Sequence, residues 1–482
     1  MVPTRYKISL LLVASLALAG CARFESLITE RSVVLPDAPK QAARDTPEQR
    51  EHNRILAAYG GAYDDPKLTT MITNVVDRLV AASERPDLKY KVTILNSPAV
   101  NAFALPTGNL YATRGLLALA NDNAELASVL AHEMAHVIAR HASIREDQVR
   151  QAVIVGRVAT DVLSDPQMGA LALAKSKIAL ASFSRQQEFE ADGIGVGISS
   201  RAGFDPYGAT RFLTSMGRNA EMKAAMQKID PHSLEFLSSH PATPERVENA
   251  QLNARQFVAP GPGSREKQDY LTAISGMVYG EDPSEGFVRG RRFLHPKLGF
   301  TFVAPEGFAL DNTSQAVFGV REAGDQALRL DVVRVPAEQS LSDYLVSGWI
   351  ENIDSTTVQE VTINGLKAAT ASAKGDPWAF RLYAVRFGSE GYRIIFAAKA
   401  IDAGLDKLFR DSVASFRRMT QTEIRQAKPL RLKVITAGPN DTLASLAARL
   451  PVDKPVERLR LLNGLDPGRN ISPGDKVKII VE

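Results

Sequence analysis

The chain has 482 residues, of which 45% are hydrophobic and 23% charged, and its formal net charge is +4 at pH 7. This length favours two to four domains, and this composition is typical of globular proteins and excludes a disordered or fibrous chain. Two of the basic residues, Arg5 and Lys7, lie in an N-terminal leader. Without them 56 basic residues face 54 acidic ones, so the charge indicates no nucleic-acid partner.

Residues 1–20 have the pattern of a lipoprotein signal peptide. A short basic start precedes an apolar run, Ile8 to Ala19, that is too short to cross a bilayer as a mature helix. The motif "LAGC" ends at Cys21 and resembles a bacterial lipobox, after which the cysteine is lipidated. Cys21 is the chain's single cysteine, which excludes an intramolecular disulfide. The alternative is an ordinary signal-peptidase site with an incidental thiol.

Composition and periodicity divide the next part of the chain. Residues 21–45 hold the lipidated cysteine and a polar tether, and Ala22 resembles the residue found there in lipoproteins sorted to the outer membrane. From 46 to 258 helical patterns dominate, with strand-like stretches at "LKYKVTIL" and "NAFALPTGNLYAT". The glycines and prolines that open 259–284 favour a linker, which is followed by a short helix.

Strand patterns take over after residue 284. Apolar runs such as "LGFTFVAP" and "GYRIIFAAKA" predict strands between 285 and 420, and a helix near 402–417 completes an α+β module. This module resembles the PsbP/Mog1-like fold, and we assign it no chemistry. Residues 430–482 follow the order strand, helix, helix, strand, which resembles a βααβ LysM module. Such modules often bind glycans of peptidoglycan; the alternative is a packing domain without a ligand.

The stretch "NDNAELASVLAHEMAHVIARH" contains the main metal-binding pattern. Asp122 as N-cap and Glu125 three residues later predict a helix that begins with a capping box. His132 and His136 are four residues apart and therefore lie on one helix face, where two imidazoles can bind one zinc ion. Glu133 lies one position further round and can reach a water molecule without being a ligand.

A third ligand is available about fifty residues downstream, in "SFSRQQEFEADGIGV". A catalytic zinc needs three protein ligands and one open position, and Glu188 supplies the missing carboxylate. Asp192, four residues later on the same face, is placed to orient a ligating histidine. Glu190 points away and is expected to be solvated. His141 falls on a different face of a continued helix and is expected to be structural or exposed.

These motifs resemble the zinc metallopeptidase family that includes the CAAX prenyl endopeptidases, and within it the soluble periplasmic branch of the β-barrel assembly-enhancing proteases. The matching motifs are "NAFALPTGNLYATRGLL", "HEMAH", "SRQQEFEAD" and "HPATPER". The resemblance implies a mainly α-helical zincin-type domain with a small sheet. It also implies one zinc ion bound by His132, His136 and Glu188, with Glu133 as general base and Asp192 behind a ligand.

For His240 the same resemblance leaves two roles open. It stabilises the oxyanion with Arg246 in support, or it closes the site as a fourth zinc ligand in a latent state; a structural histidine in a loop is the third alternative. The strand-like segment that begins at Asn101 could offer its backbone edge to an extended substrate. The residues of this substrate-binding edge are Asn101, Ala102, Phe103 and Ala104.

Together these features predict a lipid-anchored periplasmic zinc endopeptidase, held at the outer membrane, that degrades misfolded or misassembled envelope proteins. Its expected partners are unfolded or misassembled envelope proteins, the outer-membrane assembly machinery and, through the C-terminal module, peptidoglycan. The alternative is a chaperone-like assembly scaffold for outer-membrane proteins with little or no proteolysis. Loss of cleavage in a folded, zinc-bound Glu133→Gln variant supports the first function, and full function of that variant supports the second.

Overall fold

The computed structural model describes residues 46–144, 183–227, 240, 242–257, 261, 263–313, 316–321, 324–350, 352–375 and 377–482. The predicted signal peptide, the lipidation site Cys21 and the tether lie outside the described residues. The chain divides into two compact units, which are Met1–Gly60 with Pro283–Lys428, and Gly61–Asp282 with Pro429–Glu482. Within the described residues, no helix combines the length and apolarity that a membrane span requires.

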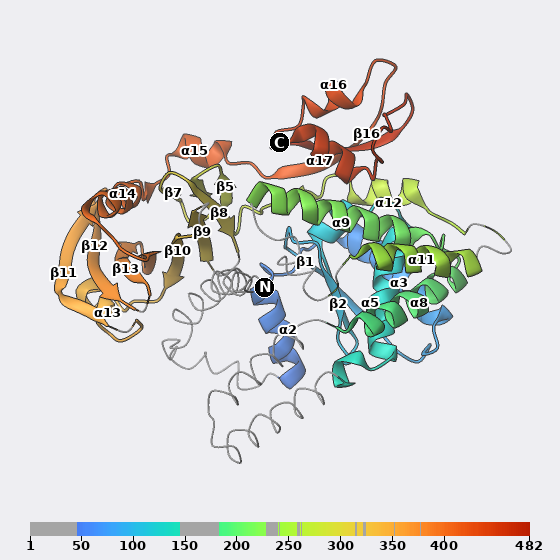
Figure 1. Ribbon diagram of the computed structural model, residues 1–482, viewed down its shortest axis with the longest axis horizontal. Helices are drawn as coiled ribbons and strands as arrows, with labels where there is room; N and C mark the ends of the chain where they lie inside the picture. The colour runs from blue at the N-terminus through green and yellow to red at the C-terminus, as the bar shows by residue number, and fades with distance from the viewer. Residues whose placement is uncertain are drawn as a thin grey trace, which may run out of the picture. The chain divides into compact units, whose positions relative to one another are not determined.

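The first unit is rich in antiparallel strands. Seven strands form one sheet, in the order β11-β12-β13-β14-β10-β9-β8, and four form another, β15-β7-β6-β5 (Figure 1). The strands are β5 (Phe287–Arg289), β6 (Arg292–His295), β7 (Phe300–Val303), β8 (Phe308–Asn312), β9 (Ala316–Arg321), β10 (Gln326–Val333), β11 (Ile353–Ile363), β12 (Leu366–Lys374), β13 (Ala379–Phe387), β14 (Glu390–Ala398) and β15 (Arg417–Arg418). Its helices are α2 (Pro47–Ala58), α13 (Leu341–Leu345), α14 (Ala403–Val413) and α15 (Gln421–Gln426).

Two apolar clusters hold this unit together, one on each face of the large sheet. An aromatic cluster joins the large sheet to the small one and to α14, where Phe409 stacks on Phe396 of β14. The other cluster lies under α13 and includes the buried Trp349. The unit is therefore an α+β module with more of its chain in strands than in helices, as the apolar runs between 285 and 420 predict.

The second unit is mainly helical. Its helices are α3 (Pro66–Ala82), α4 (Arg114–Leu119), α5 (Asn123–Ile138), α8 (Arg185–Arg201), α9 (Gly208–Gln227), α11 (Pro244–Gln256), α12 (Lys267–Ile274), α16 (Leu443–Ala447) and α17 (Pro455–Leu462). Its strands are β1 (Lys91–Leu95), β2 (Ala102–Ala104), β3 (Asn109–Thr113), β4 (Val278–Tyr279), β16 (Leu430–Thr436) and β17 (Lys476–Val481). In one small sheet β3 lies in the middle, parallel to β1 and antiparallel to β2, so β2 is an edge strand.

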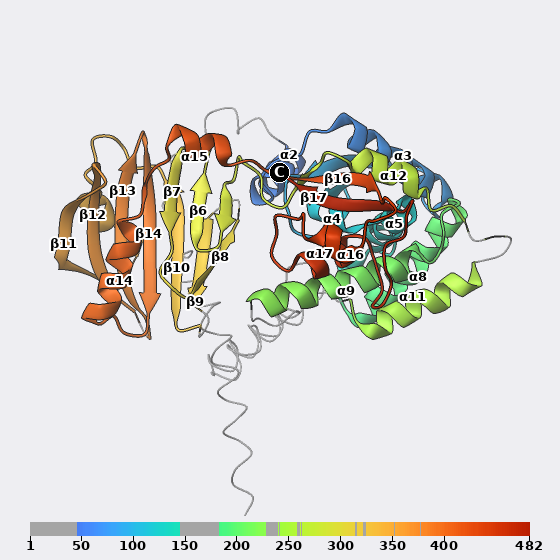
Figure 2. The same ribbon diagram turned by 90° about the horizontal axis from the view of Figure 1, so that it is seen from above.

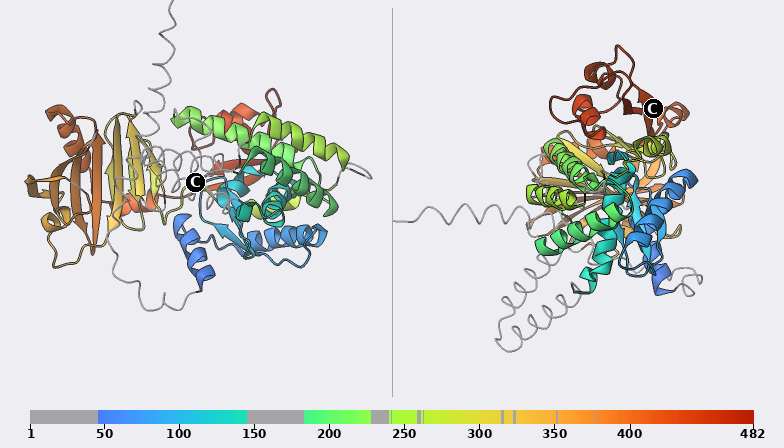
Figure 3. Two further views of the ribbon diagram at one scale, coloured as in Figure 1. Left: turned by 60° about the horizontal axis from the view of Figure 1, so that its bottom comes forward. Right: turned by 90° about the vertical axis from the view of Figure 1, so that its right-hand side faces the viewer.

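Helix α5 is the centre of this unit, and α3, α8, α9 and β2 pack around it (Figure 3). All its residues from Asn123 to His136 are buried, so α5 is a core helix and not the one-sided amphipathic helix that a single apolar stripe suggests. Two glycines allow neighbouring helices to approach it closely. A Cβ on Gly195 of α8 would lie 3.0 Å from the backbone nitrogen of His132, and one on Gly208 of α9 would lie 2.3 Å from the carbonyl oxygen of Ala124.

The start of α5 departs from the predicted capping box. Asp122 is the N-cap, and its carboxylate accepts the N–H of Glu125 at 2.8 Å. The carboxylate of Glu125, however, accepts the backbone N–H of Asn121 at 2.9 Å and not that of the N-cap residue. Arg211 of α9 lies 3.3 Å from both Asp122 and Glu125. The second half of the capping box is therefore replaced by a buried ion-pair network.

The C-terminal βααβ segment is built into the second unit. Its strand β16 pairs with β17 on one side and with β4 on the other, and β4 comes from the segment 259–284 (Figure 2). In the same segment, Tyr270 of α12 is fully buried and donates a hydrogen bond to the carbonyl oxygen of Leu117 at 2.6 Å. Apolar residues of both parts belong to one core cluster, so residues 267–279 are part of the core and do not act as a linker.

Lys478 of β17 connects this C-terminal segment to the chain just before α5. Its side chain is fully buried and donates hydrogen bonds to the carbonyl oxygens of Ala118 at 2.8 Å and Ala120 at 2.7 Å. These carbonyls lie at the C-terminal end of α4, where the helix dipole favours a cation. Burial lowers the pKa of Lys478 to about 7, although the nearby carboxylate of Glu125 opposes this shift.

We expect the wild type to gain stability relative to a Lys478→Met variant as the pH rises from about 7 to about 10. In this range the unfolded chain, with its ordinary lysine pKa of 10.5, binds more protons than the folded chain, whose Lys478 has a pKa of about 7. The contribution of Lys478 to the free energy of unfolding therefore increases with pH in the wild type and is absent from the variant. Calorimetric unfolding of both full-length proteins across this range measures the difference, and a difference independent of pH would contradict the expectation.

Candidate metal centre

Four buried side chains converge in the second unit. They are His132, His136, Glu188 and His240, and each offers one ligand atom within 4.8 Å of the others. The Nε2 atoms of His132 and His136 lie 3.0 Å apart, and each is 3.6 Å from a carboxylate oxygen of Glu188. The Nδ1 atom of His240 lies 2.8 Å from Glu188 and 3.3 Å from Nε2 of His132.

Three parts of the chain supply these donors. His132 and His136 stand one turn apart on α5, as their spacing predicts. Glu188 comes from the first turns of α8, which begins with a complete capping box between Ser184 and Gln187. His240 precedes α11, which begins at the N-cap Thr243. Local capping residues thus fix the starts of α8 and α11, near which Glu188 and His240 lie.

Asp192 and Arg246 lie behind the four donors. Oδ1 of Asp192 is 2.9 Å from Nδ1 of His132, so the carboxylate can orient that imidazole. Arg246 of α11 donates two hydrogen bonds to Asp192, at 2.7 and 2.9 Å, and lies 2.6 Å from Glu188. Burial alone would raise the pKa of Asp192, but the hydrogen bonds from Arg246 hold it below its usual range. Arg246 therefore binds the two carboxylates of α8.

Glu133 lies beside the donors and is not one of the four. Its side chain is buried, and Oε1 has no hydrogen-bond partner among the described residues. Its other oxygen is 4.0 Å from Nε2 of His240. Burial, together with the charge of Glu188, raises the pKa of Glu133 well above its ordinary value. Glu133 is thus a proton-binding group that faces the cluster without a partner of its own.

His141 contacts the back of His136, a position that helix geometry does not predict. The helix ends at Ile138, and Arg140 adopts a positive φ of 56°, so the chain turns back. Nδ1 of His141 then lies 2.8 Å from Nδ1 of His136, and its Nε2 lies 3.4 Å from Glu190. His141 is buried, and Phe183 stacks on the His136 ring at 4.0 Å between centroids. The sequence prediction missed this contact because it continued the helix through His141.

The donor set suits a zinc ion. Burial lowers the pKa values of His132 and His136, which keeps both imidazoles neutral and able to bind a metal. Burial also raises the pKa of Glu188, although His132 and Arg246 oppose this shift. Imidazole nitrogens with one carboxylate are ligands that zinc accepts. The four residues could therefore hold one zinc ion.

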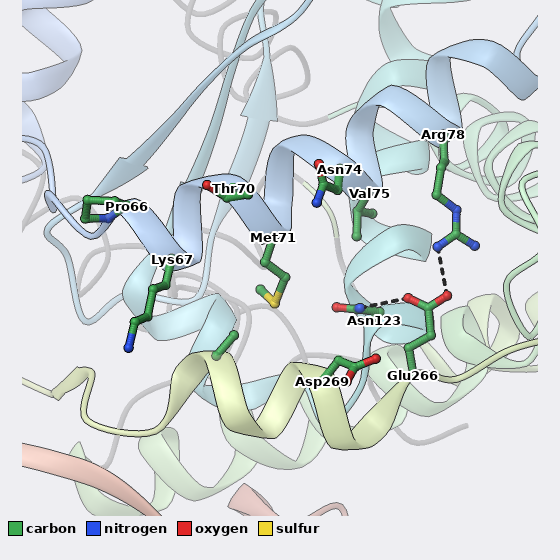
Figure 4. A pocket seen from close by; sticks show the side chains of 11 residues that line it. Pro66, Lys67, Thr70, Met71, Asn74, Val75, Arg78, Asn123, Glu266 and Asp269 are labelled. Atoms are coloured by element: carbon green, nitrogen blue, oxygen red, sulfur yellow. Dashed lines mark hydrogen bonds and ion pairs between the residues drawn. The ribbon is translucent and has the colours of Figure 1, made fainter.

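A small cavity adjoins the cluster. It has a volume of about 30 Å³ and is lined by residues of α5, α8 and α9 together with His240 and Arg246. This space holds a water molecule but not a peptide. A much larger cavity of about 650 Å³ lies between α3 and α12, with Asn123 at its edge (Figure 4). No residue that lines the larger cavity belongs to the cluster.

The predicted substrate edge lies in contact with the same helix. Strand β2 holds Ala102, Phe103 and Ala104, follows Asn101 directly, and packs against α5. Because β2 pairs only with β3, its other side ends the sheet. The ring of Phe103 stacks on Tyr111 of β3 at 4.9 Å between centroids.

Two segments of the chain match known families. Residues 66–254 match the family described as peptidase family M48, and residues 435–479 match the LysM domain. Residues 66–254 are therefore a metallopeptidase domain whose cofactor is zinc, and the chain combines this domain with a C-terminal LysM domain.

The names of three relatives of this chain describe proteases. The chain is 35% identical over 230 residues to the β-barrel assembly-enhancing protease of Yersinia pestis. The aligned residues cover 45% of each of the two proteins. It is 33% identical over 213 residues to the Escherichia coli K12 protein of that name, 42% of each chain. It is also 33% identical to the mitochondrial metalloendopeptidase OMA1 of Schizosaccharomyces pombe, over 44% of this chain and 59% of that protein. The chain thus spans less than two thirds of each of these relatives.

Among solved structures, the cyanobacterial PsbP of Synechocystis covers 29% of this chain at 13% identity. Its TM-score of 0.22 is too low to support an argument about the fold of the α+β module.

Proposed function

We propose that this chain is a zinc-dependent endopeptidase that cleaves unfolded or misassembled proteins of the bacterial envelope. The observation that carries the proposal is the convergence of His132, His136 and Glu188 with Glu133 beside them. The names of the relatives, a β-barrel assembly-enhancing protease and a metalloendopeptidase, support the same activity.

In the proposed mechanism His132, His136 and Glu188 hold the zinc ion, and Asp192 fixes the orientation of His132. When bound, zinc lowers the pKa of a water ligand towards about 7 and polarises the carbonyl of the scissile peptide. Arg246 holds both carboxylates of α8 in place and keeps Asp192 ionised. The buried surroundings strengthen each of these electrostatic interactions.

Glu133 moves the proton in this mechanism. Its unpartnered oxygen can accept the proton of the attacking water, and the same carboxyl group can then deliver it to the leaving amine. The raised pKa of Glu133, caused by burial and by Glu188, favours a group that binds the proton between these two steps.

The edge strand β2 suggests which substrates reach the site. An extended peptide could add to the edge of the sheet at β2 as a further strand, with Asn101 to Ala104 as its partner. Unfolded chains offer such extended segments and folded ones do not. We expect the zinc-loaded protein to cut a denatured outer-membrane β-barrel into internal fragments and to leave the same barrel intact after folding. Equal cleavage of both forms, seen on gels or by mass spectrometry, would refute this selectivity.

His240 is proposed to close the site as a fourth zinc ligand. Its Nδ1 lies among the other donors, and the adjoining cavity of about 30 Å³ leaves no room for a peptide. Four protein ligands would fill the position that catalysis needs open. The alternative, support of the oxyanion together with Arg246, requires His240 to stay near the substrate.

We expect His240→Ala to cleave casein faster than the wild type, because removal of the fourth ligand frees a coordination position while three ligands remain. Cleavage rate and zinc content are measured on the same preparation. A slower rate with full zinc occupancy would support the oxyanion role, and an unchanged rate with unchanged zinc would exclude the gate.

The location of the protein is part of the proposal. Lipidation of Cys21 would anchor it to a membrane, and "LAGC" with Ala22 favours the periplasmic face of the outer membrane. The LysM domain supports contact with peptidoglycan, and the outer-membrane assembly machinery is a proposed partner. The PsbP/Mog1-like fold of residues 285–420 and the resemblance to CAAX prenyl endopeptidases stay predictions.

A further inference from the structure

A polar cavity of about 310 Å³ lies where the LysM domain meets the peptidase domain, both in the second unit. One wall is formed by α9, the start of α5 and the residues just before α12. The other wall is the loop between α17 and β17, from Asn463 to Val477. None of the four donors of the metal centre lines this cavity.

Positive charge dominates the lining of this cavity. Three acidic residues line it, against twice as many basic ones. The basic residues are Arg211, Arg218, Arg265, Lys267, Arg469 and Lys476. Arg265, Lys267, Arg469 and Lys476 are also exposed to solvent, and such a group of like charges attracts anions.

The three acids are already engaged within the protein. Glu125 lies 3.3 Å from Arg211. Asp466 lies 2.8 Å from Arg218, which links the two domains. Asp475 accepts a backbone N–H at 2.9 Å. Further anionic charge for the cavity must therefore come from a ligand.

Two of the six basic residues have no ion-pair or hydrogen-bond partner for their side chains among the described residues. The side chains of Lys267 and Arg469 make no ion pair or hydrogen bond with any residue that the structure describes. Arg265, by contrast, is held by Asp122 at 2.6 Å. Burial, together with the charges of Arg265 and Arg469, lowers the pKa of Lys267. The carboxylates of Asp122 and Asp475 oppose this shift, so Lys267 lies among charges of both signs.

A buried hydroxyl group also opens to this cavity. Ser215 of α9 is 4% exposed and lines the cavity. Within the described chain its hydroxyl has no hydrogen-bond partner. Gly464 lies opposite with a positive φ of 57°, and a Cβ there would be 3.9 Å from this hydroxyl and 3.1 Å from the side-chain nitrogen of Asn121. The positive φ and the close contact with Asn121 both favour a glycine at this point.

We propose that this cavity binds a small ligand through an oxyanion, either a carboxylate or a phosphate, with Lys267 and Arg469 as its counter-charges. The hydroxyl of Ser215 donates a hydrogen bond to the same ligand. Guanidinium groups match the geometry of carboxylate and phosphate, and the volume suits a ligand the size of a dipeptide. The site is separate from zinc-dependent cleavage and does not depend on it.

Calorimetric titration of the full-length protein tests the proposal with three probes, which are acetyl-Ala-Ala, its C-terminal amide, and inorganic phosphate. The double variant Lys267→Met with Arg469→Gln removes both unpartnered cations. The matched control Lys89→Met with Lys433→Gln removes one exposed cation from each domain outside the cavity. Ser215→Ala removes the hydroxyl.

We expect an oxyanion probe to bind the wild type and the control equally, and the double variant at least tenfold more weakly. Binding of acetyl-Ala-Ala but not phosphate identifies a peptide carboxylate as the source, and the reverse identifies a phosphate. The proposal fails if the amide binds as well as the acid, if neither acid nor phosphate binds, or if the control loses as much affinity as the double variant. Since no peptide is cleaved, these results are independent of the protease activity.

Discussion

Replacement of Glu133 by Gln should reduce peptide cleavage by a factor of about 10² to 10⁴, the usual contribution of a general acid or base. Gln keeps the size of the side chain but cannot accept a proton. Zinc content should not change, because Glu133 is not one of the four converging donors. Steady-state cleavage of denatured casein, with metal analysis of the same samples, measures both quantities.

The matched control for this variant is Glu221→Gln on α9, where the same chemical change is made at an exposed position. Its cleavage rate should equal that of the wild type. If Glu133→Gln retains more than about a tenth of the activity with full zinc, Glu133 is not the proton carrier. If the variant loses cleavage but keeps full function in cells, the chaperone-like scaffold becomes the better description of the protein.

Replacement of Glu188 by Gln should remove most of the stabilisation that zinc gives to the protein. At a zinc concentration one hundred times the dissociation constant, wild-type binding adds about 2.7 kcal/mol to the free energy of unfolding. Gln keeps the shape of the side chain beside Arg246 and His240 but removes the charged ligand. A loss of affinity of about a hundredfold reduces this gain to roughly 0.4 kcal/mol.

The measured quantity is the shift of the unfolding transition on addition of zinc, compared with the chelator-treated sample. The absolute stability of the variant is not informative, because Arg246 also loses an ionised partner, 2.6 Å away. Asp192→Asn should give an intermediate loss of about 10- to 100-fold, typical of residues that orient a ligand. An unchanged zinc shift in Glu188→Gln would remove this residue from the metal site and with it the proposed mechanism.

The spacing of residues along the sequence was enough to predict most of the candidate site. His132 with His136 and Glu188 with Asp192 are pairs four residues apart, and helical periodicity puts each pair on one face. Their meeting across two helices depends on Gly195, whose missing side chain lets α8 approach the backbone of His132. That close approach leaves no pattern that local reasoning can detect.

The features that the sequence did not predict depend on where a helix ends and on which residues are buried by tertiary contacts. His141 reaches His136 because α5 stops at Ile138, whereas a continued helix would carry it to another face. Lys478 lies in a strand pattern that normally exposes a lysine, and only the tertiary contact with the end of α4 buries it. The sequence predicts a linker and then a short helix in 259–284, but no local pattern predicts that Tyr270 of this helix is fully buried.

The shared core of the second unit has a consequence for the lifetime of the protein. A protease that removed the last fifty residues would take away Lys478, strip β4 of its neighbour and uncover apolar side chains directly before α5. A molecule trimmed in this way would lose its metallopeptidase fold. It would not persist as an active enzyme without its LysM domain.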